Sequence, residues 1–170
     1  MRVFTEQQRF TQTWFLAVLL VSLIGPIVII TNQFLKKNSS MDVTEFTVVI
    51  SLLLITIIPI FFFTLKTRID EIGVHYQFTP FHLSKKIILW NEIDKAYVRK
   101  YDAISEYGGW GLKGGWLWKK KNGVAYNVSG DIGVQLKLAN GKKILIGTKK
   151  QQDIERAIAT YFKKLETSNN

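Results

Sequence analysis

Two long runs of apolar residues near the N-terminus constrain this 170-residue chain more than any other feature of its sequence. The runs cover residues 14–30 and 46–65, and neither contains a charged side chain. A helix rises about 1.5 Å per residue, so roughly 20 apolar residues cross a hydrocarbon core about 30 Å thick. The second run reaches that length, and residues 31–35 extend the first into the headgroup region. The sequence therefore predicts a transmembrane hairpin with spans at about 14–33 and 46–65.

Two other interpretations of the runs are weaker. Their Ile and Val content suits strands, but strands usually end after about 4–8 residues, and neither run alternates between apolar and polar positions. A cleaved signal peptide would explain Arg2 and Arg9 ahead of the first run. No cleavage site of small residues follows that run, however, and a second run comes soon after it.

Basic residues beside the runs predict the orientation of the hairpin. Arg2 and Arg9 precede the first run, Lys66 and Arg68 follow the second, and the connecting loop has two lysines, at 36–37. A hairpin places both of its ends on one side of the membrane, so the ends together have more basic residues than the loop. Both termini and the soluble domain are therefore expected in the cytoplasm.

The chain is strongly basic and contains no cysteine. Its formal net charge is +10 at pH 7, and nearly all of the excess lies after residue 65. Such a domain suits an anionic membrane leaflet or a nucleic acid, and its attachment to the second run favours the leaflet. The alternative, that the lysines only keep a small β-domain soluble, stays open. Without cysteine, disulfides and thiol nucleophiles are excluded.

After residue 65 the hydrophobic period becomes that of short strands. The predicted strands cover residues 72–78, 87–90, 93–99, 133–138 and 143–146. Asn140-Gly141 joins the last two, which is a strong hairpin signal. The period then becomes that of a helix over about 151–166. Its apolar stripe consists of Ile154, Ile158, Tyr161, Phe162 and Leu165.

The order of several short motifs resembles a known family. The motifs are WNEI at 90–93, YGGWGLK at 107–113, AYNVSG at 125–130, GVQL at 133–136 and ILIGT at 144–148. They resemble bacterial membrane-anchored proteins with a pleckstrin-homology-like domain. The resemblance implies seven antiparallel strands in two orthogonal sheets, a C-terminal helix that plugs one open end, and a location in the bacterial plasma (inner) membrane. No phosphoinositide motif comes with it, and residues 114–122 depart from the pattern as an enlarged loop.

The expected fold is thus an α+β, multi-pass membrane protein. Residues 1–65 are expected to form a tail and a two-helix transmembrane hairpin. Residues 66–170 are expected to form a pleckstrin-homology-like antiparallel β-barrel or sandwich with one C-terminal amphipathic helix.

The stretch of tryptophans and lysines after residue 115 is the leading candidate for contact with the membrane or a partner. It consists of Trp116, Trp118, Lys119, Lys120 and Lys121. Indoles favour the headgroup region and lysines favour anionic lipid. In the alternative, both indoles pack onto the domain and the lysines form a solvated hairpin tip.

Residues 109–114 match the dinucleotide-binding fingerprint letter by letter, but no helix is expected to start after them. We interpret Gly108, Gly109 and Gly111 as positions that permit a bulge and a tight turn, with Trp110 packed against the barrel.

The remaining polar residues suggest no chemistry. His75 and His82 are the only histidines and lie an odd number of residues apart, so no metal site is expected. Glu92 and Asp94 form a potential carboxylate pair, but ion pairs with nearby lysines are the favoured interpretation. The sequence therefore predicts no enzyme, no cofactor and no metal.

The leading hypothesis is a non-catalytic, membrane-anchored binding or assembly module. Its basic domain would contact anionic lipid headgroups or a protein partner, including a second copy of the chain, and nucleic acid is the less favoured partner. The alternative is an accessory subunit of a membrane transporter or enzyme complex.

Overall fold

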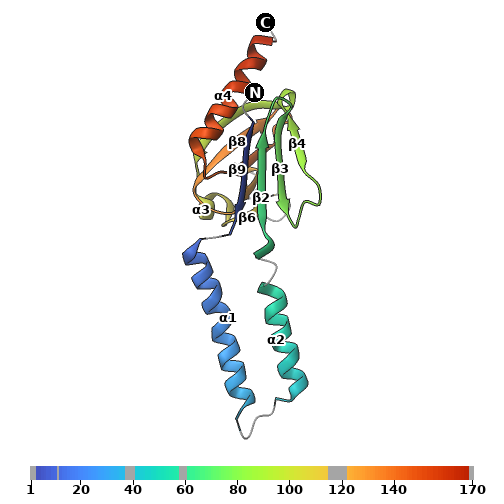
Figure 1. The fold of residues 1–170 in the computed structure, drawn as a ribbon, viewed down its shortest axis with the longest axis vertical. Helices are drawn as coiled ribbons and strands as arrows, with labels where there is room; N and C mark the ends of the chain where they lie inside the picture. The colour runs from blue at the N-terminus through green and yellow to red at the C-terminus, as the bar shows by residue number, and fades with distance from the viewer. Residues whose placement is uncertain (1–2, 11, 37–40, 58–60, 115–121, 169–170) are drawn as a thin grey trace. The chain divides into compact units, whose positions relative to one another are not determined.

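The computed structural model describes residues 3–10, 12–36, 41–57, 61–114 and 122–168, with side chains as far as Tyr161. The protein is a mixed α+β chain with two compact units (Figure 1). One unit is Phe10–Phe62, and the other joins Met1–Arg9 to Phe63–Asn170. The predicted boundary at residue 65 is therefore wrong for the N-terminal tail, which belongs to the sheet unit.

The helical unit consists of α1 (Thr13–Phe34) and α2 (Val43–Ile57). Helix α1 is long and apolar enough to cross a membrane, and α2 is a shorter apolar helix. Phe34 at the end of α1 stacks on Phe46 of α2, with 4.6 Å between ring centroids.

The second predicted span, 46–65, is wrong at its C-terminal end, because Thr64 and Leu65 begin a strand. Leu65 is fully buried in the core of the sheet unit. The apolar run thus continues from the helical segment into a protein core, and hydropathy does not mark the change.

The first sheet has four antiparallel strands, in the order β1-β2-β3-β4. Their bounds are β1 (Phe4–Arg9), β2 (Thr64–Ile69), β3 (Gly73–Thr79) and β4 (Lys86–Leu89). Strand β1 was not expected from the sequence. It buries Phe4, Glu6 and Gln8 on one face and exposes the residues between them.

Hydrogen bonds hold β1 against the turn that precedes the C-terminal helix. The Glu6 carboxylate accepts hydrogen bonds from Thr148 Oγ1 at 2.6 Å and from the Lys149 amide at 2.9 Å. Gln8 Nε2 donates to the Gly147 carbonyl at 2.7 Å. The first residues of the chain are therefore part of the sheet unit's interior.

The register of the first sheet fixes where the helical segment departs. Arg9 is the cross-strand partner of Thr64, which in turn pairs with Thr79. Residues 10–63 therefore leave the sheet and return to it at the same point. We call this end of the sheet the exit end. It is where β1 and β3 end and β2 begins.

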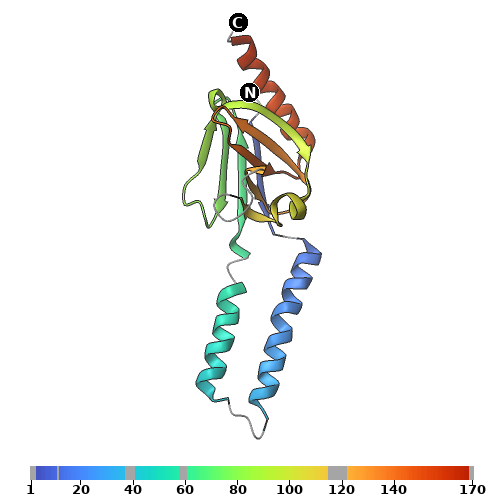
Figure 2. The ribbon, with the colours of Figure 1, turned by 180° about the vertical axis from the view of Figure 1, so that it is seen from behind.

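The second sheet has five strands in the order β5-β8-β9-β7-β6. Figure 2 shows the sheet unit from behind, with the yellow-to-orange strands of this sheet in view. Their bounds are β5 (Ile93–Lys100), β6 (Gly111–Lys113), β7 (Val124–Asn127), β8 (Ile132–Leu138) and β9 (Lys143–Gly147). The predicted Asn140-Gly141 turn joins β8 to β9, which confirms that hairpin. The expectation of seven antiparallel strands is wrong for the described residues. They form nine strands in two sheets that do not close into one, and β7 pairs with β9 in parallel.

Helix α4 (Gln151–Ser168) confirms the predicted C-terminal helix. Ile154, Ile158 and Tyr161 of its apolar stripe are buried, and Tyr161 stacks on Trp90 with 6.0 Å between ring centroids. The side chains of Phe162 and Leu165 lie outside the described residues. The helix contacts strands of both sheets, namely β1, β2, β5 and β8.

Candidate functional site

The residues of the tryptophan–lysine stretch, 116 and 118–121, lie outside the described part of the chain. The glycines before them follow α3 (Ala103–Tyr107) and have positive φ angles of 75° at Gly108, 115° at Gly109 and 114° at Gly111. Such angles favour glycine, and the bulge and tight turn at these positions stay a prediction. The Trp110 indole donates to the Gly130 carbonyl at 3.2 Å.

The other predicted candidates are not brought together. His75 lies in β3, whereas His82 is buried in the loop that follows it. Glu92 Oε2 accepts a hydrogen bond from the Leu89 amide at 3.0 Å, and neither Glu92 nor Asp94 forms an ion pair with a described residue. Within the described ranges, no group of three or more acidic or histidine side chains is arranged to hold a metal ion.

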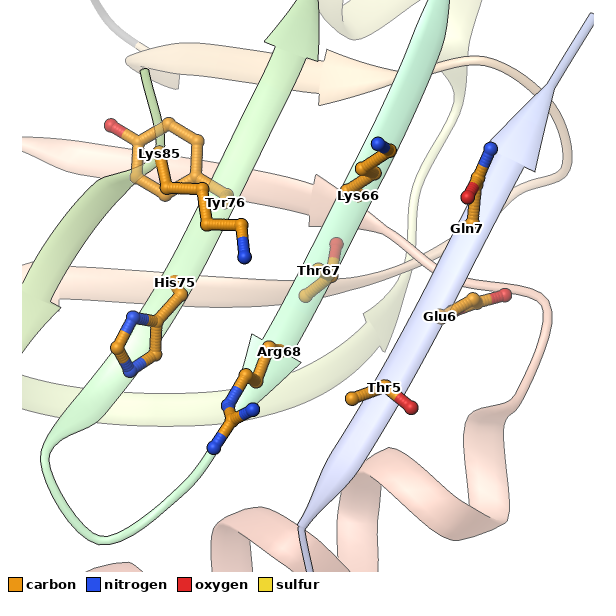
Figure 3. A pocket seen from close by; sticks show the side chains of 9 residues that line it. All are labelled: Thr5, Glu6, Gln7, Lys66, Thr67, Arg68, His75, Tyr76 and Lys85. Atoms are coloured by element: carbon orange, nitrogen blue, oxygen red, sulfur yellow. The ribbon is translucent and has the colours of Figure 1, made fainter.

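Basic side chains gather instead on the outer face of the first sheet. A cavity of about 330 Å³ opens there over β1, β2 and β3 (Figure 3). Its lining residues are Thr5, Glu6, Gln7, Lys66, Thr67, Arg68, His75, Tyr76 and Lys85. We call the side chains of Lys66, Arg68, His75 and Lys85, together with Thr5 and Gln7, the basic face.

Strand register explains why these side chains meet. Arg68 pairs with Thr5 on one side and His75 on the other, and Lys66 pairs with Gln7. Partners directly opposite each other in antiparallel strands point to the same face. Residues that are far apart in the sequence therefore line one surface.

A buried carboxylate neutralises the half of the basic face that is far from the exit end. Asp70 Oδ2 accepts from Arg68 Nε at 2.8 Å, and Asp70 Oδ1 lies 2.9 Å from His75 Nε2 and accepts from the Ile72 amide at 3.0 Å. Burial alone would raise the pKa of Asp70, but the hydrogen bonds from His75, Arg68 and the Ile72 amide outweigh it and lower the pKa to about 2. Asp70 is therefore charged at neutral pH.

The uncompensated positive charge lies nearer the exit end. Lys66 and Lys85 form no ion pair with any described carboxylate, and the same holds for Arg9 at the end of β1. All three side chains are exposed. Positive charge is therefore unevenly distributed on the basic face. Arg68 and His75 lie beside Asp70 at one end, whereas Lys66 and Lys85 have no described ion-pair partner toward the other.

Buried His82, whose ring packs on Tyr76 and Tyr126, should make the stability of the sheet unit depend on pH. Its Nδ1 accepts the Phe78 amide at 3.2 Å. Burial and the charge of Lys86 lower the pKa of His82 below its ordinary 6.5. The unfolded chain then binds the proton more readily, so stability falls as pH drops below about 6.5, and the loss ends below the lowered folded pKa.

The variant His82→Asn keeps an acceptor for the Phe78 amide but cannot titrate. We expect its unfolding temperature to change less between pH 7.5 and pH 5 than that of the unmodified chain, as followed by near-ultraviolet circular dichroism. Both proteins retain His75, so the comparison isolates the substitution at residue 82. Parallel pH curves would show that His82 does not contribute.

Sequence reasoning identified only part of this site. In the sequence, Lys66 and Arg68 indicate the orientation of the hairpin, and no local pattern links them to Lys85 or Asp70. The cross-strand pairing of β1, β2 and β3 makes that link, and pairing partners are not visible in a single sequence.

Comparison with known proteins adds no assignment to this geometry. No protein-family model matches the chain, and a search of curated proteins finds no relative.

Proposed function

We propose that this chain is a non-catalytic, membrane-anchored binding module whose basic face contacts anionic lipid headgroups. The observation that supports this most is the pairing of Arg9 with Thr64. A segment that returns to its starting point crosses a bilayer an even number of times. Since α1 is long and apolar enough for one crossing, the apolar sequence from residue 46 onward supplies the second.

The distribution of charge supports contact with the membrane surface. A strand rises about 3.4 Å per residue, so Lys66 lies roughly 7 Å along β2 from Thr64. The Debye length at physiological salt is about 8 Å, and each basic residue near an anionic leaflet contributes about 1 kcal/mol. Lys66, Lys85 and Arg9 therefore lie where an anionic surface at the exit end would attract them. Basic residues beside the hairpin favour a cytoplasmic sheet unit.

We also propose a pleckstrin-homology-like architecture for the sheet unit and a bacterial plasma membrane location. Two sheets and a C-terminal helix that contacts both support the architecture. The parallel pairing of β7 with β9 is a departure from it.

The test uses the full-length protein in nanodiscs. The chain has no cysteine, so Gln7→Cys places one environment-sensitive fluorophore on the basic face. We expect a blue shift in discs that contain phosphatidylglycerol, relative to discs of phosphatidylcholine alone. The double change Lys66→Gln and Lys85→Gln removes two charges, about 2 kcal/mol of attraction, and should abolish the difference, as should high salt.

The matched control carries the fluorophore at Asn140→Cys, in the exposed turn between β8 and β9. Its emission should be the same in both kinds of disc. Contact between the basic face and headgroups would be refuted if the emission wavelength at Gln7→Cys were the same in both kinds of disc. It would also be refuted if the two lysine substitutions left the difference unchanged.

A further inference from the structure

The loop between β3 and β4, residues 80–85, lies at the exit end of the first sheet. Thr79, which precedes it, is the cross-strand partner of Thr64, where the chain returns from the helical segment. Figure 1 shows this loop at the same end of the sheet as the end of β1 and the start of β2. The loop therefore lies at the end of the sheet where residues 10–63 connect to β1 and β2.

The loop exposes large apolar side chains in an unusual way. Phe81 is 57% exposed and Leu83 is 96% exposed, whereas His82 between them is 9% exposed. The buried histidine divides the loop so that its two apolar neighbours face outward. Exposed apolar side chains indicate an interaction surface where they form part of a contiguous apolar patch.

Hydrogen bonds hold the loop in this arrangement. His82 accepts the Phe78 amide at Nδ1, and its own amide donates to the Phe78 carbonyl at 2.8 Å. Gln77 Nε2 donates to the carbonyls of His82 at 3.2 Å and Leu83 at 3.3 Å. We call Phe81 and Leu83 the apolar tip. Because these hydrogen bonds hold the loop in one conformation, the entropy cost of binding through the apolar tip is lower.

The apolar tip is continuous with the aromatic residues at the exit end. The Phe81 ring lies 5.6 Å from that of Phe63 and 5.9 Å from that of Phe78. Exposed Lys85 and Lys86 follow Leu83 after one serine. Apolar side chains followed by lysines are the pattern of segments that lie in a membrane interface, since the apolar groups enter the acyl boundary and the ammonium groups remain among the headgroups.

We propose that this loop inserts Phe81 and Leu83 into the interfacial zone of the bilayer that residues 10–63 cross. The inference rests on the proposed membrane anchorage and extends it, because it assigns a second, monotopic contact to the sheet unit. A lipid surface is favoured over a protein partner because the tip lies at the exit end and is followed by uncompensated cations.

Site-directed spin labelling of the full-length protein in vesicles of phosphatidylcholine and phosphatidylglycerol tests the loop. Single labels at Phe81→Cys and Leu83→Cys should collide more often with oxygen, which partitions into lipid, than with a water-soluble nickel chelate. Ile24→Cys in α1 is the lipid reference. Ile72→Cys is the matched aqueous control, because Ile72 is 54% exposed in the turn between β2 and β3 at the opposite end of the sheet. We expect the oxygen-to-nickel ratio at Leu83 to exceed that at Ile72 and approach that at Ile24.

The outcomes separate this inference from the proposed anchorage. A lipid-like Ile24 with a water-like Leu83 would overturn the inserted loop and leave the anchorage standing. A Leu83 label that neither reagent reaches would indicate burial against protein, and would also overturn it. A water-like Ile24 would refute the anchorage itself, and the loop insertion with it. Thermal melting of each labelled protein verifies that the sheet unit remains folded.

Discussion

Deleting residues 1–9 should abolish the stable fold of the sheet unit, although these residues precede the first predicted span. The deletion removes the buried ring of Phe4 and the hydrogen bonds of Glu6 and Gln8 to residues 147–149. Loss of a buried phenylalanine costs about 3–5 kcal/mol, and hydrogen bonds to a charged group contribute about 1.5–3 kcal/mol each. This sum is comparable with the roughly 5–15 kcal/mol that holds a typical domain together.

Hydrogen exchange of the detergent-solubilised protein measures the effect, because β2 and α4 should lose their protected amides. Paired substitutions on β1 supply a matched control. Phe4→Ala with Gln8→Ala alters the buried face, whereas Thr5→Ala with Gln7→Ala alters the exposed face. Only the first pair should reproduce the deletion, and unchanged protection in the deleted chain would refute the structural role of β1.

A complementary variant should fold without any apolar segment. Arg9 and Thr64 are cross-strand partners, so a four-residue turn in place of residues 10–63 can join β1 to β2 as an ordinary hairpin. A fragment that starts at Lys66 lacks β1 and the first residues of β2, and we expect it to aggregate.

The variant Asp70→Ala should have the second largest effect, about 2–3 kcal/mol of lost stability at pH 7. It deprives Arg68, His75 and the Ile72 amide of their shared acceptor at the turn between β2 and β3. Because the folded pKa of about 2 lies below the ordinary 3.8, the carboxylate contributes its full stabilisation above pH 3.8. That contribution is lost as the pH falls toward 2.

Chemical denaturation of the full-length protein at pH 7 and again near pH 2 tests this prediction. The substituted and unmodified chains should differ most at pH 7 and converge in acid. Glu71→Ala is the matched control, since Glu71 is an exposed carboxylate in the same turn. If Asp70→Ala and Glu71→Ala had equal effects, the hydrogen-bonded role of Asp70 would be wrong.

The elements that were predictable have strong local signals. The run that became α1, the Asn140-Gly141 turn and the apolar stripe of α4 each follow from the spacing of nearby residues. Strand β1 had no such signal, because two of its three buried side chains, Glu6 and Gln8, are polar. Their partners are more than a hundred residues away in the sequence. Without knowledge of those partners, a glutamate is expected at the surface.

The candidate site was harder to predict than the fold for a related reason. Lys66 and Arg68 were visible as basic residues beside an apolar run, and the run's continuation into β2 was not. The loop with Phe81 and Leu83 had the sequence of an ordinary break after Thr79. Its orientation depends on the burial of His82, which only the packed structure shows.

The pairing of β1 with β2 also constrains when the sheet unit can fold during synthesis. Strand β1 leaves the ribosome first, yet its partner emerges only after all of residues 10–63 have been made. Closing a flexible loop of about 50 residues costs roughly 3–4 kcal/mol of chain entropy. In the proposed topology, insertion of the two helices brings the ends of that loop together before β2 appears. Insertion of the membrane segment would then favour completion of the sheet unit, and a chain that failed to insert would pair β1 with β2 less readily.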